Sequence, residues 1–314
     1  MEPMTSAEPT PLHDMAPPSD PILMGFRADR GTPELLGREW GYGWKVQSAV
    51  LRRAHHADTA IWSAKMRHKL KPSGIGVVRP LSSSDGRYIL GGWHADTWVQ
   101  GHPAPRFDEI AAASLLLSES IDQAMGVGGN DRFSENPLPQ IDLDERPWTT
   151  QHLFAAADQA AFSEDPSQVI APGLDVSAVA SSTVAQALEL ASSVAALRDE
   201  VRAPNRVVSS DMVGTTVFDG SSPAVVTEIP PVFHPHAWPV ALTVVDGMAW
   251  GNADDGLASR WSHLPDFDEM MVRAVLYRLF IHALHPDAKE SSLVGLGRMV
   301  EVVRARRGSG VRTS

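Results

Sequence analysis

The sequence predicts an α+β protein of two lobes, a β-rich lobe over residues 21–101 followed by a larger helical lobe over residues 102–308. Up to Gly101, short apolar runs alternate with polar residues and are separated by glycines, which is typical of strands. Beyond "WVQGHPAP" the apolar residues recur every three or four positions, which is typical of helices. Within the helical part, residues 207–229 return to strand-like runs around a loop, which indicates an embedded hairpin.

In the β-rich lobe, the segment 22–52 is expected to be strand material, with a hairpin over 37–52 that has Gly41 and Gly43 at its turn. Residues 57–70 lack proline and are expected to form a short helix. Two further strand regions follow, "GVVRPL" and "YILGGWHADTWVQG", the second broken at its glycine pair.

The helical lobe contains six segments with helical periodicity, which are 108–125, 146–162, 177–201, 236–250, 267–284 and 291–307. The two ends of the chain differ from this pattern. Residues 1–20 are acidic and proline-rich, without an apolar stretch, and are expected to be a disordered tail rather than a signal peptide. Residues 309–314 are expected to be a short tail.

Composition limits the possible functions. Of 314 residues, 27 are Lys or Arg and 38 are Asp or Glu, so the net charge of −11 argues against a nucleic-acid partner. There is no cysteine, which excludes disulfides, thiol nucleophiles and cysteine-ligated zinc. The apolar runs are too short to span a membrane. We therefore expect a cytoplasmic protein whose partner is a small-molecule ligand or another protein.

The hairpin segment "VVSSDMVGTTVFDGSSPAVVTEI" carries the main chemical signal, because Asp211 stands in its entry loop and Glu228 follows its return strand. This layout resembles the protein-kinase-like fold of the aminoglycoside phosphotransferases and related small-molecule kinases. It looks most like an actinobacterial branch of that superfamily with a degenerate active site. The family pattern is His-Gly-Asp, a spacer, Asn, a hairpin and then Asp. The matching residues here are Ser209, Asp211, Thr215 and Glu228.

The resemblance implies ATP and Mg²⁺ as cofactors and gives roles to these positions. Asp211 matches the catalytic base, while Thr215 and Glu228 match the two metal ligands. A threonine hydroxyl reaches less far than the family's asparagine, and glutamate moves the carboxylate outward by one methylene. Because Mg²⁺ demands near-ideal octahedral geometry, both changes are expected to weaken the metal site.

In the β-rich lobe, the stretch "GREWGYGW" resembles a glycine-rich hairpin that lies over a nucleotide, although Gly41 and Gly43 could equally form a plain turn. Arg52 falls at the position of the family's phosphate-binding lysine. The helix over 57–70 contains no glutamate to pair with it, so an exposed arginine at a strand end is expected. Trp98, one of four tryptophans in this lobe, is a candidate for nucleotide contact, against core packing as the alternative.

Histidines give a weaker signal. The pairs His55–His56 and His234/His236 lack further ligands at helical spacing and are expected to be packing or solvent-facing side chains rather than metal ligands.

Three functions remain open. The favoured one is a degenerate phosphotransferase-fold protein, impaired or inactive in catalysis, that serves as a ligand-binding or protein-interaction module. The alternative is an ATP- and Mg²⁺-dependent small-molecule kinase of a hydroxyl- or amine-bearing acceptor, with Asp211 as base and Arg52 on phosphate. In the third, the hairpin resemblance is accidental and the helices form an interaction scaffold.

Overall fold

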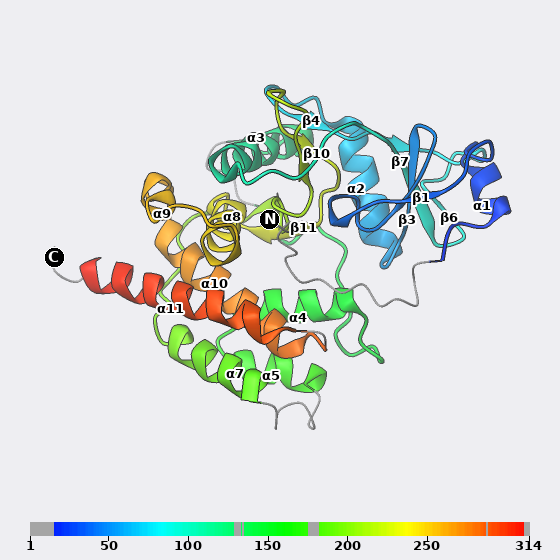
Figure 1. Ribbon diagram of the computed structural model, residues 1–314. Coiled ribbons are helices and arrows are strands. Elements are labelled where there is room, and N and C mark those ends of the chain that lie inside the picture. The colour runs from blue at the N-terminus through cyan, green and yellow to red at the C-terminus, as the bar shows by residue number, and fades with distance from the viewer. Residues whose placement is uncertain (1–15, 129–132, 134, 175–181, 287, 311–314) are drawn as a thin grey trace. The chain divides into compact units, whose positions relative to one another are not determined.

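The computed structural model describes residues 16–128, 133, 135–174, 182–286 and 288–310. The chain forms two compact units, and Figure 1 shows the elements of both. One unit combines Thr10–Pro139 with Pro204–Pro239, and the other combines Gln140–Ala203 with Val240–Ser314. Most of the expected tails, 1–15 and 311–314, lie outside the described residues, and the expected lobe boundaries stay a prediction.

The first unit is organised by an antiparallel sheet of six strands in the order β1-β2-β3-β7-β5, with β6 paired to β7 beside this path. The strands are β1 (Glu34–Leu35), β2 (Trp44–Val46), β3 (Ala49–Arg53), β5 (Pro80–Leu81), β6 (Ile89–Leu90) and β7 (Trp93–Thr97). Gly91 and Gly92 both have positive φ and turn the chain between β6 and β7, as the sequence predicts.

The two central strands, β3 and β7, separate apolar from polar side chains because successive residues of a strand face opposite sides of the sheet. On one side, Leu51 and Ala95 join an apolar cluster with Leu23 of helix α1 (Asp20–Gly25). The residues of the other register positions, Val50, Arg52, His94 and Asp96, therefore share the opposite face, where Val50 pairs with Asp96 and Arg52 with His94.

Two sequence-based expectations for this sheet are wrong. The start of segment 22–52 is helical, because Pro21 lies in the first turn of α1 and Asp20 adds an acidic side chain there. Gly41 and Gly43 do lie at a hairpin turn before Trp44, in the loop between β1 and β2, but the run "WKVQSAVL" is not one returning strand, because it contains a second turn between β2 and β3. That second turn contains Gln47 at φ 57°, a non-glycine residue in the left-handed region, which the sequence pattern does not reveal.

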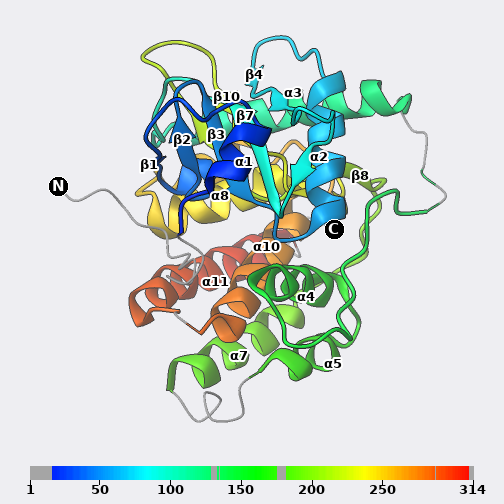
Figure 2. The ribbon, with the colours of Figure 1, turned by 90° about the vertical axis from the view of Figure 1, so that its right-hand side faces the viewer.

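Helices and a nested hairpin complete the first unit (Figure 2). The helices α2 (Ala57–Lys69) and α3 (Phe107–Met125) contact each other, and α2 also contacts β5 and β6. The expected embedded hairpin is present as one antiparallel pair inside another: β9 (Thr216–Val217) with β10 (Val225–Val226), inside β8 (Arg206–Ser209) with β11 (Pro231–His234). Strand β10 also pairs in parallel with β4 (Gly76–Val77).

The second unit is helical. Its helices are α4 (Thr150–Phe162), α5 (Pro166–Ile170), α7 (Ser182–Ala195), α9 (Leu257–Arg260), α10 (Phe267–Leu284) and α11 (Glu290–Gly310), with the short 3-10 helix η3 (Ala171–Gly173) and most of α8 (Ala237–Trp250). Helix α10 contacts α4, α7 and α11, and 16 of its 18 residues are buried (Figure 1).

The six expected helices are all present as α3, α4, α7, α8, α10 and α11, although the expected start of α7, residues 177–181, lies outside the described residues. The sequence analysis missed the short helices α5 and α9, which are too brief to show a period. Among the described residues, no helix is both long and apolar enough to cross a membrane.

The buried pair between Asp246 of α8 and Arg278 of α10 gives a stability test for the helical unit. Its two hydrogen bonds measure 2.8 and 2.6 Å, and each side chain is only 9% exposed. We expect Asp246→Asn to cost about 3–5 kcal/mol of unfolding free energy in urea denaturation, because it leaves a buried guanidinium without its counter-charge. The exposed Asp254, which pairs with Arg260, is the control, and Asp254→Asn should leave stability unchanged. Equal losses in both variants would contradict this account.

Candidate functional site

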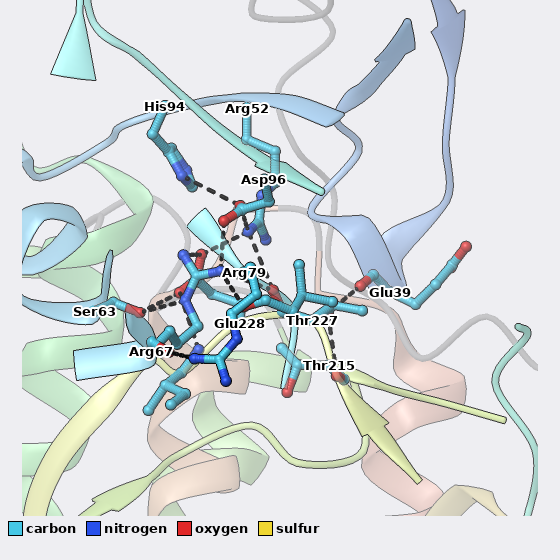
Figure 3. Close-up of polar contacts among 12 residues, drawn as sticks. Glu39, Arg52, Ser63, Arg67, Arg79, His94, Asp96, Thr215, Thr227 and Glu228 are labelled. Atoms are coloured by element: carbon cyan, nitrogen blue, oxygen red, sulfur yellow. Dashed lines mark hydrogen bonds and ion pairs between the residues drawn. The ribbon is translucent and has the colours of Figure 1, made fainter. Parts of the chain in front are cut away.

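Four charged side chains form a closed network in the first unit, which we call the ion network: Arg52, Arg67, Asp96 and Glu228 (Figure 3). Each carboxylate contacts both guanidinium groups. Arg52 Nη2 is 2.8 Å from Glu228 Oε2 and also bonds Asp96. Arg67 Nη1 is 2.5 Å from Asp96 Oδ1, and its Nε is 3.4 Å from Glu228 Oε1. Opposite charges therefore alternate around the network.

The fold brings these side chains together from three directions. Arg52 of β3 and Asp96 of β7 point from the same face of the sheet. Ser63 and Arg67, one helical turn apart, lie on one side of α2, and the Ser63 hydroxyl bonds Glu228. Glu228 follows β10, and its Oε1 also accepts a hydrogen bond from the amide of Ile229 at 2.9 Å.

Burial makes the charges of this network depend on one another. Arg67 and Asp96 are fully buried, and the Glu228 side chain is 20% exposed. Burial acts to lower the pKa of Arg67, but Asp96 and Glu228 more than offset it and the pKa is raised. For Glu228, burial acts to raise the pKa, whereas Arg67 and Arg52 hold it well below its usual range. Arg67 and Glu228 are therefore both charged near neutral pH, in a network that joins two arginines to two acidic residues.

His94 borders the network as a neutral side chain. Its Nδ1 lies 3.6 Å from Asp96 Oδ2. Burial, and next the positive charge of Arg52, lower the pKa of His94 to about 4.

Three residues of this region have side chains that could bind a metal ion. His94, Asp96 and Glu228 each offer a ligand atom, and these atoms lie within 4.8 Å of one another. Both carboxylates, however, already bind two guanidinium groups, which would stand beside any cation placed there. The donor set is thus satisfied by arginine, and the residues present do not fit a divalent metal.

Asp211 lies at the same end of the nested hairpin as Glu228, and two threonines link them. Thr227 donates its amide to Thr215 O at 2.8 Å, and the Thr215 hydroxyl donates to Asp211 O. The Asp211 carboxylate accepts the amide of Gly214 at 2.9 Å and pairs with Arg38 at 3.3 Å. The structure therefore places the two acidic positions of the motif at the same end of the hairpin, where Asp211 pairs with Arg38 and Glu228 with Arg52 and Arg67, and the Thr215 hydroxyl is hydrogen-bonded to the backbone.

Residues 36–43, between β1 and β2, form a loop that we call the covering loop. The carbonyl of Glu39 accepts the Thr227 hydroxyl at 2.6 Å. Gly43 lies against Arg52, and a Cβ at this position would stand 2.6 Å from Arg52 Cγ. Gly41 has φ 56°, which favours glycine, and a Cβ there would meet Arg52 Cδ at 3.5 Å. The absence of side chains at these glycines thus leaves room for the side chain of Arg52.

The other candidate residues from the sequence, Trp98, His234 and His236, make different contacts. Trp98 is partly buried against a small cluster that contains Trp40, and the ammonium of Lys45 lies 3.9 Å from its ring centre. His234 is buried, and its ring contacts that of Trp238 edge-on. His236 Nε2 is 3.0 Å from Asp122 Oδ2.

The expectation of an exposed Arg52 is wrong, since this residue is only 6% exposed. A partner for Arg52 was expected only from the helix over 57–70, which contains no glutamate. The structure instead supplies Asp96 from a neighbouring strand and Glu228 from the hairpin.

The sequence analysis also missed Arg67, Asp96, Ser63, His94, Thr227 and Arg38 as site residues. One signal for Asp96 is available, because an acidic residue within a predicted strand requires a partner if the strand is buried. A similar signal is available for Arg67. It stands four residues after Ser63 in a predicted helix, so the two polar side chains lie on the same side of that helix.

Comparisons with known proteins identify the fold. No protein-family model and no curated protein matches the sequence. Among solved structures, the chain is similar to a thermostable mutant of aminoglycoside phosphotransferase APH(4)-Ia in a ternary complex with AMP-PNP and hygromycin B. The identity is 14% and the TM-score 0.53, and the match covers 90% of this chain and 98% of the other.

Two further solved structures agree. A microcompartment-associated aminopropanol kinase matches at 13% identity and TM-score 0.53, covering 91% of this chain and 98% of the other. The amicoumacin kinase hAmiN, in complex with AMP-PNP, Ca²⁺ and Ami, matches at 12% identity and TM-score 0.50, covering 87% and 88%. The chain therefore has the protein-kinase-like fold of the aminoglycoside phosphotransferases and related small-molecule kinases, with an N-terminal antiparallel sheet and a helical C-terminal part.

Proposed function

We propose that this protein is a phosphotransferase-fold protein that has lost metal-dependent phosphoryl transfer and acts as a ligand-binding or protein-interaction module. The observation that carries the proposal is the engagement of Glu228 by both Arg52 and Arg67. Glu228 stands at the position that the family resemblance gives to a metal-binding aspartate. Here its charge is neutralised by two guanidinium groups.

The electrostatics support a loss of the metal site. Phosphoryl transfer depends on Mg²⁺ that bridges the phosphates and on carboxylates that hold this ion. A divalent cation at Glu228 would have to replace guanidinium groups that are themselves buried, and the two would then share the single carboxylate of Asp96. The second ligand position offers only the neutral hydroxyl of Thr215, whose direction is set by its hydrogen bond to the backbone carbonyl of Asp211.

The phosphate-binding position supports the same conclusion. Arg52 stands where the resemblance places a lysine, but it is buried and its charge is shared between Asp96 and Glu228. Where a glutamate would pair with that lysine, α2 presents Arg67, so the sign of the charge is reversed. A phosphate would find no unpaired positive charge in this network.

One observation favours the alternative, an active kinase with a rebuilt site. Asp211 is retained, and its side chain is 23% exposed beside the partly exposed Arg38. A carboxylate in this setting can serve as a general base once Arg38 moves away.

The direct test is nucleotide binding with and without Mg²⁺, followed by thermal melting. A site with a dissociation constant near 10 µM gains about 2.7 kcal/mol from 1 mM nucleotide, which raises Tm by about 4 °C in a chain of this size. We expect no Mg²⁺-dependent rise with ATP, because the donor set is occupied by arginine. A rise of that size in the presence of Mg²⁺, and not with EDTA, would overturn the proposal.

If ATP consumption is detected, Asp211→Asn decides whether it arises at this site. A genuine base at position 211 predicts a loss of at least about 100-fold in kcat with nucleotide binding retained. Asp219→Asn, at an exposed carboxylate of the same hairpin, is the matched control and should keep full activity. Consumption that survives Asp211→Asn would come from another source.

His94, which borders the ion network, predicts how the free energy of unfolding depends on pH. The pKa of His94 is about 4 in the folded state and about 6.5 when unfolded, so the unfolded chain binds the extra proton between these values. Stability contributed by neutral His94 is therefore present above pH 6.5 and lost as the pH falls towards 4, by about 3 kcal/mol in total. Urea denaturation from pH 7.5 to 4 should show this loss, and His94→Gln should reduce it. His68→Gln, at an exposed position of α2, is the control and should follow the wild-type profile.

A further inference from the structure

We propose that the exposed side of helix α2 is a docking surface for an acidic segment of another protein. We call this surface the lysine face, and its residues are Ile61, Trp62, Lys65, His68 and Lys69. The inference rests on the proposed function, because it gives the protein-interaction role a surface and a kind of partner.

The lysine face runs along one side of α2, with Lys65 at its centre. The two apolar residues lie four and three positions before Lys65, and His68 and Lys69 lie three and four positions after it, so neighbouring members share one side of the helix. The three polar residues are exposed, and the two apolar residues are partly buried. The opposite side carries the buried Met66 and Arg67, which fix the helix to the core cluster and to the ion network. The lysine face is therefore the solvent side of a firmly held helix.

Lysine is concentrated at this surface. The chain contains five lysines, and three of them, Lys65, Lys69 and Lys71, lie in the C-terminal half of α2 or directly after it. All three are exposed, and no carboxylate of the described residues forms an ion pair with them. Lys45, by contrast, pairs with Glu34 at 3.9 Å. In a chain with 38 acidic and 27 basic residues, the positive charge of this surface stays available to a partner.

Capping of the helix does not account for these lysines. Arg79 Nη1 donates to the carbonyl of Arg67 at 2.8 Å and to that of His68 at 3.3 Å. A guanidinium therefore already serves the carbonyl groups at the C-terminal end of α2, where a cation is most favourable. Lys65 stands a full turn before that end, where the helix dipole has little effect.

A protein segment with carboxylates beside an apolar side chain complements this surface. The ammonium groups of the lysines attract carboxylates and steer their approach. Ile61 and Trp62 supply apolar area next to them, and tryptophan is one of the residue types that contribute most to binding at interfaces. Helix α2 has 13 residues and is about 20 Å long, which suits a single peptide segment.

Two other partners fit this surface less well. Asp58 is exposed and lies seven positions before Lys65, on the same side of α2 and about 10 Å away along the helix axis. Its carboxylate repels a continuous row of phosphates, which argues against a nucleic acid. A second copy of this chain also carries a net charge of −11, and the long-range repulsion between two such copies opposes their association.

The test begins with a selection of random peptides of about 12 residues, displayed on phage and captured by the full-length protein in the absence of ATP and Mg²⁺. We expect the enriched peptides to contain more Asp and Glu than the unselected library, next to an aliphatic or aromatic residue. The most enriched peptide, synthesised with a fluorescein label, then gives a dissociation constant from fluorescence anisotropy.

Charge reversal on the lysine face locates the binding. Lys65→Glu and Lys69→Glu should each weaken binding of the peptide at least about tenfold. Lys289→Glu makes the same change at an exposed lysine of the helical unit, and this matched control should alter the dissociation constant by less than about twofold. Ile61→Ala should weaken binding about three- to tenfold, and urea denaturation of each variant shows that it is folded.

Enriched peptides without an excess of acidic residues would overturn the inference, as would binding that both lysine variants leave unchanged. A single-stranded RNA oligonucleotide that binds more tightly than the peptide, in a way that depends on Lys65, would also overturn it in favour of a nucleic acid. So would a dimer in sedimentation that Lys69→Glu dissociates, because a second copy would then occupy this surface. These measurements use neither ATP nor Mg²⁺, so their failure is distinct from the finding that metal-dependent phosphoryl transfer is retained.

Discussion

The mutual neutralisation of two buried arginines and two carboxylates is the constraint on which the first unit depends. Moving a charged side chain out of water costs several kcal/mol, and this cost is recovered only when an opposite charge lies at close range with good geometry. Here each of the four groups contacts two groups of opposite sign. The sheet, α2 and the end of the hairpin can therefore occupy only the placement that keeps all four contacts.

This constraint is the basis of the proposal that a chain with the fold of a phosphotransferase has lost its metal-dependent chemistry. In a kinase of this fold, positive charge must be available to phosphate and negative charge to metal. In this chain Arg52 and Glu228 satisfy each other directly. The glycines of the covering loop then serve the packing of Arg52, since a side chain at Gly43 would collide with it. The fold is retained, while the charged groups of Arg52 and Glu228 pair with each other.

The sequence predicted most of the architecture, because the periodicity of the long helices and the nested hairpin is encoded locally. The proximity of Asp211 and Glu228 also followed from local sequence, since a hairpin joins its own ends. The burial of Arg52 did not, because its partners come from distant segments; Arg52 and Asp96, for example, are 44 positions apart. The turn between β2 and β3 was missed because no glycine or proline marks it, and Gln47 itself takes the left-handed conformation there.

The composition of the first unit from two separate stretches, Thr10–Pro139 and Pro204–Pro239, has a consequence for biosynthesis. When the ribosome has completed the first stretch, Arg52 and Arg67 share one carboxylate, that of Asp96. Glu228 emerges only after the intervening helical residues have been made. The nascent sheet must therefore leave one guanidinium in water until then, and a fragment that stops before residue 204 lacks the charge needed to bury it.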